Sequence, residues 1–229
     1  SRGLGDVYKR QKLIVSAKLF LLSVLISTFF GIPLGFYAAL KQGTPTDPAI
    51  VSLTLILYAM PVFLTAPLLI IIFALELGWV PVSGWGGIFD KRAILPAITV
   101  GLPGIAVIAR LMRASTLDVI GQEFITFAKA KGVDRFSINF KHVGRNAILP
   151  VVTVLGLSFS GMLGGALIVE LIFGIPGVAR FALDAIFSRD YPIIMALTLI
   201  GTASLVVANL IVDILYVFLD PRIKYTNEN

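Results

Sequence analysis

The sequence predicts an all-α protein that crosses a membrane several times, and three observations lead to this fold class. Of the 229 residues, 57% are hydrophobic and only 14% are charged, whereas soluble domains carry about 25% charged residues. The mean hydropathy is +0.94. The apolar residues gather in uncharged stretches that approach or exceed the length of about 20 residues needed by a spanning helix.

Helices are favoured over a closed barrel, because the stretches are uniformly apolar and lack the alternation of membrane strands. Five stretches predict five spanning helices: residues 19–40, 49–75, 93–109, 146–169 and 191–212. Prolines in the second and third stretches predict bends near a transport pathway, since broken helix hydrogen bonds are tolerated where they line a cavity. These prolines are Pro61, Pro67, Pro96 and Pro103.

Lysine and arginine are more frequent in the loops on one side of the predicted bundle, and the richer side is expected to be cytoplasmic. This orientation puts Lys41, the loop 110–145 and the C-terminus inside. It puts the start of the chain outside, although residues 1–18 are basic. Residues 1–11 contain no apolar core of a secretion signal. We therefore expect residues 1–11 to be a non-native leader and the natural chain to have a further helix upstream.

The composition argues against several classes of function. The chain has no Cys and one His, which excludes thiolate chemistry and a multi-histidine metal site, so we predict neither a catalytic nor a metal site. A phosphate-binding P-loop is absent, as are the short motifs of serine hydrolases and zinc proteases. The basic residues lie between apolar runs, which favours membrane topology over nucleic-acid binding. A secondary transporter and a membrane enzyme are kept as alternatives.

The loop 110–145 contains a predicted amphipathic helix at residues 122–131, which are good helix formers. A stripe of apolar residues follows helical spacing, and Gly132 is expected to end the helix in a left-handed conformation. The stripe consists of Ile120, Phe124, Phe127 and Ala128. Apolar anchors bordered by charge indicate docking into a groove of a partner. The alternative is a helix that lies on the lipid headgroups.

Two carboxylates and two glycine patterns complete the candidates. Glu170 and Asp213 lie at the ends of apolar stretches, where we expect them to cap or pair, with a proton relay as the alternative. The small residues at 31–35 and 161–165 predict close helix packing.

Several motifs in order resemble the transmembrane permease subunits of binding-protein-dependent ABC importers, and in particular their dipeptide and oligopeptide branch. The resemblance covers residues 12–224. Its motifs are residues 77–84 (LGWVPVSG), 130–132 (AKG), 141–150 (KHVGRNAILP), 170–177 (ELIFGIPG), 189–192 (RDYP), 209–213 (NLIVD) and 219–222 (LDPR). The sequence departs from the "EAA" loop for which the family is named, because Thr126 and Phe127 stand where the E and the first A belong.

The resemblance implies a type I ABC importer transmembrane domain over residues 12–224, followed by a tail at residues 225–229. The family's first helix and the outside domain after it are missing. The implied function is a permease subunit that imports di- or oligopeptides across the cytoplasmic membrane of a prokaryote. A nickel chelate or glutathione remains open as the substrate.

The resemblance also implies the partners: a second permease, two ATPase subunits and an extracytoplasmic binding protein. This chain would be no enzyme and would bind no cofactor, because ATP and Mg²⁺ belong to the ATPases. The loop helix would be the coupling helix, with ATPase-docking residues Glu123, Phe124, Thr126, Phe127, Ala128, Lys131, Gly132 and Arg135. Its supporting residues would be His142, Arg145, Asn146 and Pro150.

Overall fold

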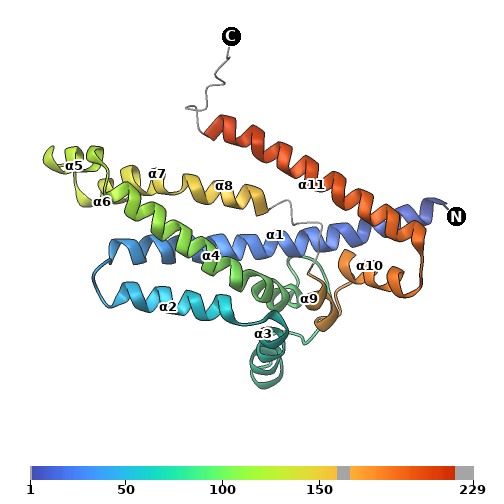
Figure 1. The fold of residues 1–229 in the computed structure, drawn as a ribbon. Helices are drawn as coiled ribbons and strands as arrows, with labels where there is room; N and C mark the ends of the chain where they lie inside the picture. Colours follow the sequence, from blue (N-terminus) through green and yellow to red (C-terminus); the bar gives the residue numbers. More distant parts are fainter. Residues whose placement is uncertain (1, 159–165, 220–229) are drawn as a thin grey trace, which may run out of the picture.

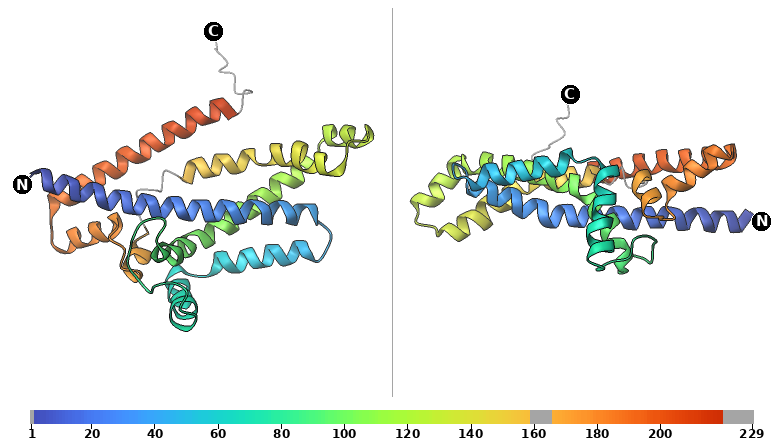
Figure 2. Two further views of the ribbon diagram at one scale, coloured as in Figure 1. Left: turned by 180° about the vertical axis from the view of Figure 1, so that it is seen from behind. Right: turned by 90° about the horizontal axis from the view of Figure 1, so that it is seen from below.

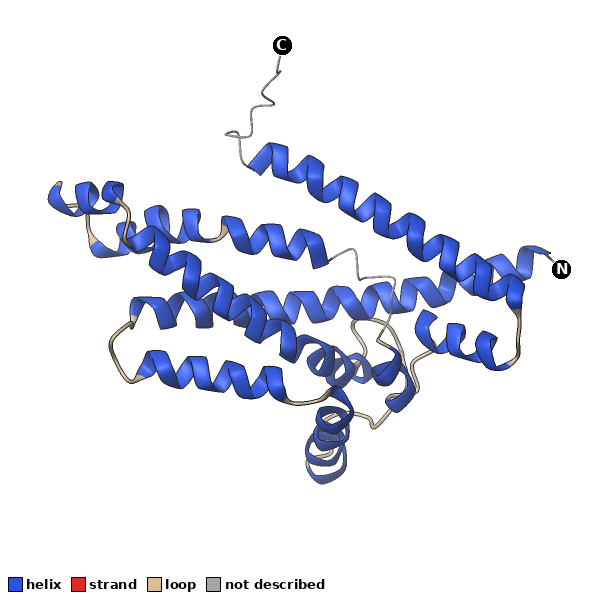
Figure 3. Ribbon diagram, viewed as in Figure 1, coloured by secondary structure: helices blue, strands red, loops and turns tan. Residues whose placement is uncertain are grey.

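All elements that the structure describes are helical. The structure, a computed structural model, describes residues 2–158 and 166–219, and no strand occurs among them (Figures 1 and 3). The prediction of an all-α protein is confirmed. The elements are α1 (Arg2–Leu40), α2 (Thr46–Ala59), α3 (Val62–Leu69), the π-helix η1 (Ile70–Glu76), the 3₁₀-helix η2 (Lys91–Ala93), α4 (Ile94–Ile120), α5 (Glu123–Ala130), α6 (Arg135–Ser137), the π-helix η3 (Ile138–Gly144), α7 (Arg145–Ala147), α8 (Leu149–Ser158), α9 (Leu167–Ile172), α10 (Val178–Phe187) and α11 (Tyr191–Leu219).

The pair α1 and α4 forms the centre of the fold. The two helices approach closely at glycines: a Cβ atom on Gly31 would lie 2.8 Å from Ile108, and one on Gly35 would overlap the Ala109 carbonyl. The Ser27 hydroxyl donates a 2.8 Å hydrogen bond across the interface to the Gly101 carbonyl. Small residues and interhelical hydrogen bonds replace the hydrophobic effect between helices in lipid. The close packing predicted at residues 31–35 is confirmed.

The second predicted span, residues 49–75, is bent, because it consists of two helical parts that meet at an angle of 100°. Met60 is extended, with φ −70° and ψ 118°, and Pro61 follows it. The Pro61 ring disfavours helical geometry in the preceding residue, which explains the break. Pro67 lies inside α3, whereas α4 continues as one helix through Pro96 and Pro103. Whether the four prolines line a transport pathway stays a prediction.

Two other predicted spans correspond to long helices. By length and composition, residues 10–40 and the segment from η2 to the end of α4 could each cross a membrane, and the bent pair could count as a third span. The fifth stretch lies within α11, a helix of 29 residues. The fourth, residues 146–169, includes residues 159–165, which lie outside the described residues together with their glycines, as does the Asp213 side chain.

The connecting segments gather at the two ends of the bundle (Figures 1 and 2). One end carries the turn between α1 and α2, and the segment from α5 to α7. The other end carries the loop 77–90, α9, α10 and the start of α11. Lys41 and the loop 110–145 therefore share one end, as the predicted topology requires. Each end has its own apolar cluster, one around Ile125 and Val143 and the other around Phe173 and Ile175.

Candidate docking surface

The helix α5 follows directly after the long helix α4, which is called the α4 lever below. α4 runs without interruption to Ile120, Gly121 and the extended Gln122 turn the chain, and α5 begins at Glu123. The first turn of α5 contains an acidic residue, Glu123, which suits the positive end of the helix dipole. The predicted helix at residues 122–131 agrees with the observed one within one residue at each end.

The helix α5 buries the face that carries Ile125 and leaves the predicted aromatic anchors exposed. Ile125 is completely buried in the apolar cluster with Val119 and Val143, whereas Phe124 and Phe127 are 40% and 68% exposed. The exposure of Phe124 and Phe127 agrees with their prediction as anchors for a partner, whereas Ile125, which the chain after Gly132 covers by folding back, was not among the predicted residues. Ile125 and Ala128 are three residues apart, and this spacing was the signal that could have identified the buried face.

The end of α5 is a Schellman turn built on Gly132. The Val133 amide donates to the Ala128 carbonyl and the Gly132 amide to the Lys129 carbonyl, at 3.2 and 3.0 Å. Gly132 has φ +76°, a conformation that only residues without a Cβ atom adopt at little cost. The left-handed end predicted at Gly132 is therefore confirmed. The turn fixes the direction in which the chain returns toward the bundle.

The return segment starts at a capped helix end. The Asp134 carboxylate accepts a 2.8 Å hydrogen bond from the Ser137 amide at the start of α6. This bond lowers the pKa of Asp134 below its ordinary value. From α6 the chain continues through η3 and α7 to α8. The turn at Gly132, the cap at Asp134 and the helical turns that follow place the chain over the buried face of α5.

Aromatic side chains connect this surface to α1. Phe36 of α1 is 9% exposed and contacts Phe140, with ring centroids 5.5 Å apart, and Phe140 contacts Phe136 at 4.6 Å. Phe136 and Phe140 are themselves 68% and 54% exposed. The sequence analysis missed these two residues, because they lie after the predicted helix at residues 122–131. With Phe124 and Phe127 they leave four phenylalanine rings exposed at one end of the molecule.

The segment that carries these rings is also rich in basic side chains. The exposed cations are Lys129, Lys131, Arg135, Lys141 and Arg145. Of the predicted supporting residues, Asn146 donates a 2.6 Å hydrogen bond from its amide nitrogen to the His142 carbonyl. Pro150 lies in the first turn of α8, where the missing amide costs least. The residues predicted to dock are thus brought together, with Thr126, Phe127 and Lys131 exposed.

A partly buried ion pair connects α2 to α4. The Arg113 guanidinium of α4 donates from Nε and Nη2 to the two Asp47 carboxylate oxygens, both at 2.6 Å. Asp47 lies in the first turn of α2 and its side chain is 9% exposed. Such a two-bond pair fixes geometry as well as charge. The pair links the turn between α1 and α2 to the part of α4 that carries α5.

The opposite end of the bundle is organised by Glu170. This residue is completely buried in α9, and its carboxylate accepts hydrogen bonds from the Ser16 hydroxyl at 2.6 Å and the Arg180 amide at 2.8 Å. The expectation that Glu170 caps a helix is confirmed, because the Arg180 amide belongs to the first turn of α10. A Cβ atom on Gly177 would overlap the carboxyl group, which explains the glycine at that position.

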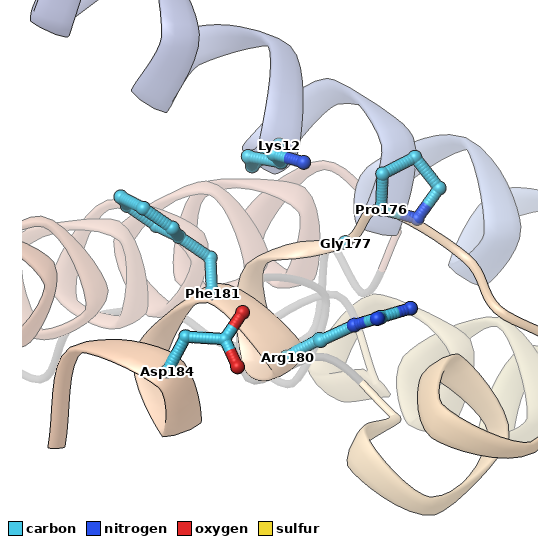
Figure 4. A pocket seen from close by; sticks show the side chains of 6 residues that line it. All are labelled: Lys12, Pro176, Gly177, Arg180, Phe181 and Asp184. Atoms are coloured by element: carbon cyan, nitrogen blue, oxygen red, sulfur yellow. The ribbon is translucent and has the colours of Figure 1, made fainter. Parts of the chain in front are cut away.

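The neighbouring loops have specific contacts of their own. The Gly84 amide donates a 2.7 Å hydrogen bond to the Phe173 carbonyl, which joins the loop 77–90 to α9. Beside α10, a pocket of about 270 Å³ is lined by residues from α1, α10 and the turn before α10 (Figure 4). The lining residues are Lys12, Pro176, Gly177, Arg180, Phe181 and Asp184. Within the described part of the chain, no three His, Asp or Glu side chains are placed to hold a metal ion.

These observations place the short amphipathic helix α5 at one end of a bundle of apolar helices. Comparisons with known proteins assign the class of the protein. Residues 31–225 match the family "Binding-protein-dependent transport system inner membrane component". The chain belongs to this family. It is therefore a membrane component of such a transport system and not a member of an enzyme family.

Relatives and a solved structure agree with this assignment. The chain is 38% identical to the oligopeptide transport system permease protein OppB of Haemophilus influenzae, over 92% of this chain and 69% of that protein. It is 39% identical to the permease protein AppB of Bacillus subtilis, over 90% of this chain and 68% of that protein. The crystal structure of an amino acid ABC transporter with histidines has the same fold, with a TM-score of 0.69, 19% identity, and 94% and 95% of the two chains covered.

Proposed function

We propose that this chain is one permease of an ABC importer that moves peptides into the cytoplasm. The family assignment supports a role in import, and the names of the relatives OppB and AppB support oligopeptides as the substrate class. Glutathione and nickel chelates remain alternative substrates within this family. A secondary transporter is not supported, because the matched family serves binding-protein-dependent systems.

The proposed orientation has α5 in the cytoplasm and α10 outside. The basic residues at the α5 end support it, since cytoplasmic loops are rich in Lys and Arg. α11 runs from the α10 end back toward the α5 end, so that this last described helix ends on the side proposed as cytoplasmic (Figure 1). The binding protein would then dock at the end that carries the loop 77–90 and α10.

The single observation that carries the mechanism is the exposure of Phe127 on a helix whose opposite face is buried against the bundle. Ile125 is buried beneath the helix, while Phe127 is 68% exposed. One of the two ATPase subunits would bind here, and the other would bind the second permease, which completes the pore. ATP and Mg²⁺ would bind to the ATPases. An ATPase that closes on nucleotide would move α5, and the α4 lever would carry that motion to the pair α1 and α4.

The test is Phe127→Asp in the full transporter. A buried apolar contact that becomes a carboxylate should abolish both co-purification of the ATPase and ATP-driven peptide uptake. For co-purification of the ATPase, Phe89→Asp is the matched control, because Phe89 is 98% exposed at the other end of the bundle. An ATPase that stays bound to the Phe127→Asp permease at normal affinity would overturn the proposed docking.

A further inference from the structure

A notch lies between the end of α5 and the start of η3 on the docking surface. Its volume is about 500 Å³, and its lining residues are Lys129, Val133, Arg135, Ile138 and Asn139. Ile138 is buried and Val133 is half-buried, so the floor is apolar. Lys129 and Arg135 are exposed, so the rim is positive. No carboxylate is among these lining residues.

The lining of the notch suits a negatively charged group at the end of a short apolar side chain. Two cations and the Asn139 amide offer hydrogen-bond donors at the rim, while the floor accepts methylene groups. Asp134 is close in sequence, but its carboxylate accepts the Ser137 amide and acts as a helix cap. A glutamate or aspartate side chain of another protein has the required chemistry.

The position of α5 favours a protein occupant over a lipid headgroup. Arg113 pairs with Asp47 at the level of the turn between α1 and α2. From Arg113 to Ile120, α4 rises about 10 Å further, whereas the headgroup layer of one leaflet is about 5 to 8 Å thick. Figures 1 and 2 show α5 and α6 beyond the turn between α1 and α2 at that end.

We propose that the notch receives an acidic side chain of the ATPase subunit. The inference rests on the proposed docking of α5 and adds a charged contact to the apolar contact at Phe127. The groove of the ATPase then has an apolar floor with an acidic residue at its rim, opposite Lys129 and Arg135. Charge complementarity of this kind fixes register and makes association dependent on salt.

The test measures the affinity of the purified ATPase for the permease pair in lipid nanodiscs. Arg135→Glu should raise the dissociation constant by at least about tenfold, because a like charge then faces the acidic side chain. Arg135→Gln should have a smaller effect. Lys141→Glu is the matched control, since Lys141 is an exposed cation of the same loop that does not line the notch. Its affinity should stay near that of the wild type.

The outcomes separate this inference from the proposed function. If Phe127→Asp releases the ATPase while Arg135→Glu binds normally, the notch is not a contact, although the docking of α5 stands. Equal weakening by Arg135→Glu and Lys141→Glu indicates general attraction between charges and also overturns the notch. A third result would assign the notch to a lipid phosphate instead. In it, the wild type binds phosphatidylglycerol vesicles and Arg135→Glu does not, while both bind the ATPase with the same affinity. Normal ATPase binding by Phe127→Asp overturns the proposed docking of α5, on which the notch inference rests.

Discussion

The Ser16 hydroxyl donates a 2.6 Å hydrogen bond to the Glu170 carboxylate, across 154 positions of the chain and inside a buried site. The same hydroxyl accepts a 2.8 Å hydrogen bond from the Val178 amide. One serine therefore joins α1 to both α9 and α10. A buried polar group that loses its partner costs more free energy than a surface one, which makes this serine a sensitive position.

Ser16→Ala should destabilise the protein by about 1 to 3 kcal/mol, because it leaves the Val178 amide and one Glu170 oxygen without a partner. Thermal unfolding in detergent measures the loss as a lower midpoint. Ser188→Ala is the control, since the exposed Ser188 hydroxyl bonds carbonyls of its own helix. Equal midpoints for the two variants would show that the Ser16 hydrogen bonds contribute no stability.

Gly35→Ala should lower the unfolding midpoint strongly. The new Cβ atom would overlap the Ala109 backbone, and overpacking of this kind costs about 1 to 3 kcal/mol. Gly201→Ala is matched to it, because a Cβ atom on Gly201 meets no atom within 4 Å. A Gly35→Ala protein as stable as Gly201→Ala would contradict the close approach of α1 and α4.

Gly132→Ala should loosen the end of α5 without any clash. Its Cβ atom would meet nothing within 4 Å, yet φ is +76°, and a left-handed alanine costs about 1 to 2 kcal/mol. Amide hydrogen exchange in residues 123–133 should become about tenfold faster. Gly121→Ala tests the specificity of this effect, because Gly121 has φ −75° and should leave exchange unchanged. Exchange in the Gly132→Ala protein as slow as in the wild type would show that the Gly132 turn does not stabilise α5.

The local features of α5 were predictable, whereas its partners across the fold were not. Helix formers and Gly132 set both ends of α5 through neighbouring residues alone. Ile125 was missed because its burial depends on the way the later segment folds back. The pairing of Asp47 with Arg113 spans 66 positions, and no periodic pattern relates two such residues. The break at Pro61 was foreseeable as a bend, but its angle depends on packing around α3.

The conformation of the loop 77–90, between η1 and η2, should change in acid when Asp90 becomes protonated. Arg92 donates side-chain and backbone hydrogen bonds to Asp90, which lowers its pKa to about 2. An unfolded aspartate titrates near about 3.9, so the stabilisation is complete above that pH and is lost as pH falls toward 2. In a Trp79→Phe background, Trp85 fluorescence should distinguish wild type from Asp90→Asn at neutral pH and converge with it in acid. A difference that stays undiminished at about pH 1, below both pKa values, would contradict the assigned cause.

The most direct measurement uses the absence of native cysteine. Phe127→Cys and Phe89→Cys each introduce one thiol, and both parent side chains are exposed, at opposite ends of the bundle. A membrane-impermeant maleimide should label Cys variants at 89 from outside and at 127 only from inside. Added ATPase should protect position 127 and leave position 89 reactive. Labelling of position 127 from outside, or its undiminished labelling with saturating ATPase, would contradict α5 as the cytoplasmic docking helix.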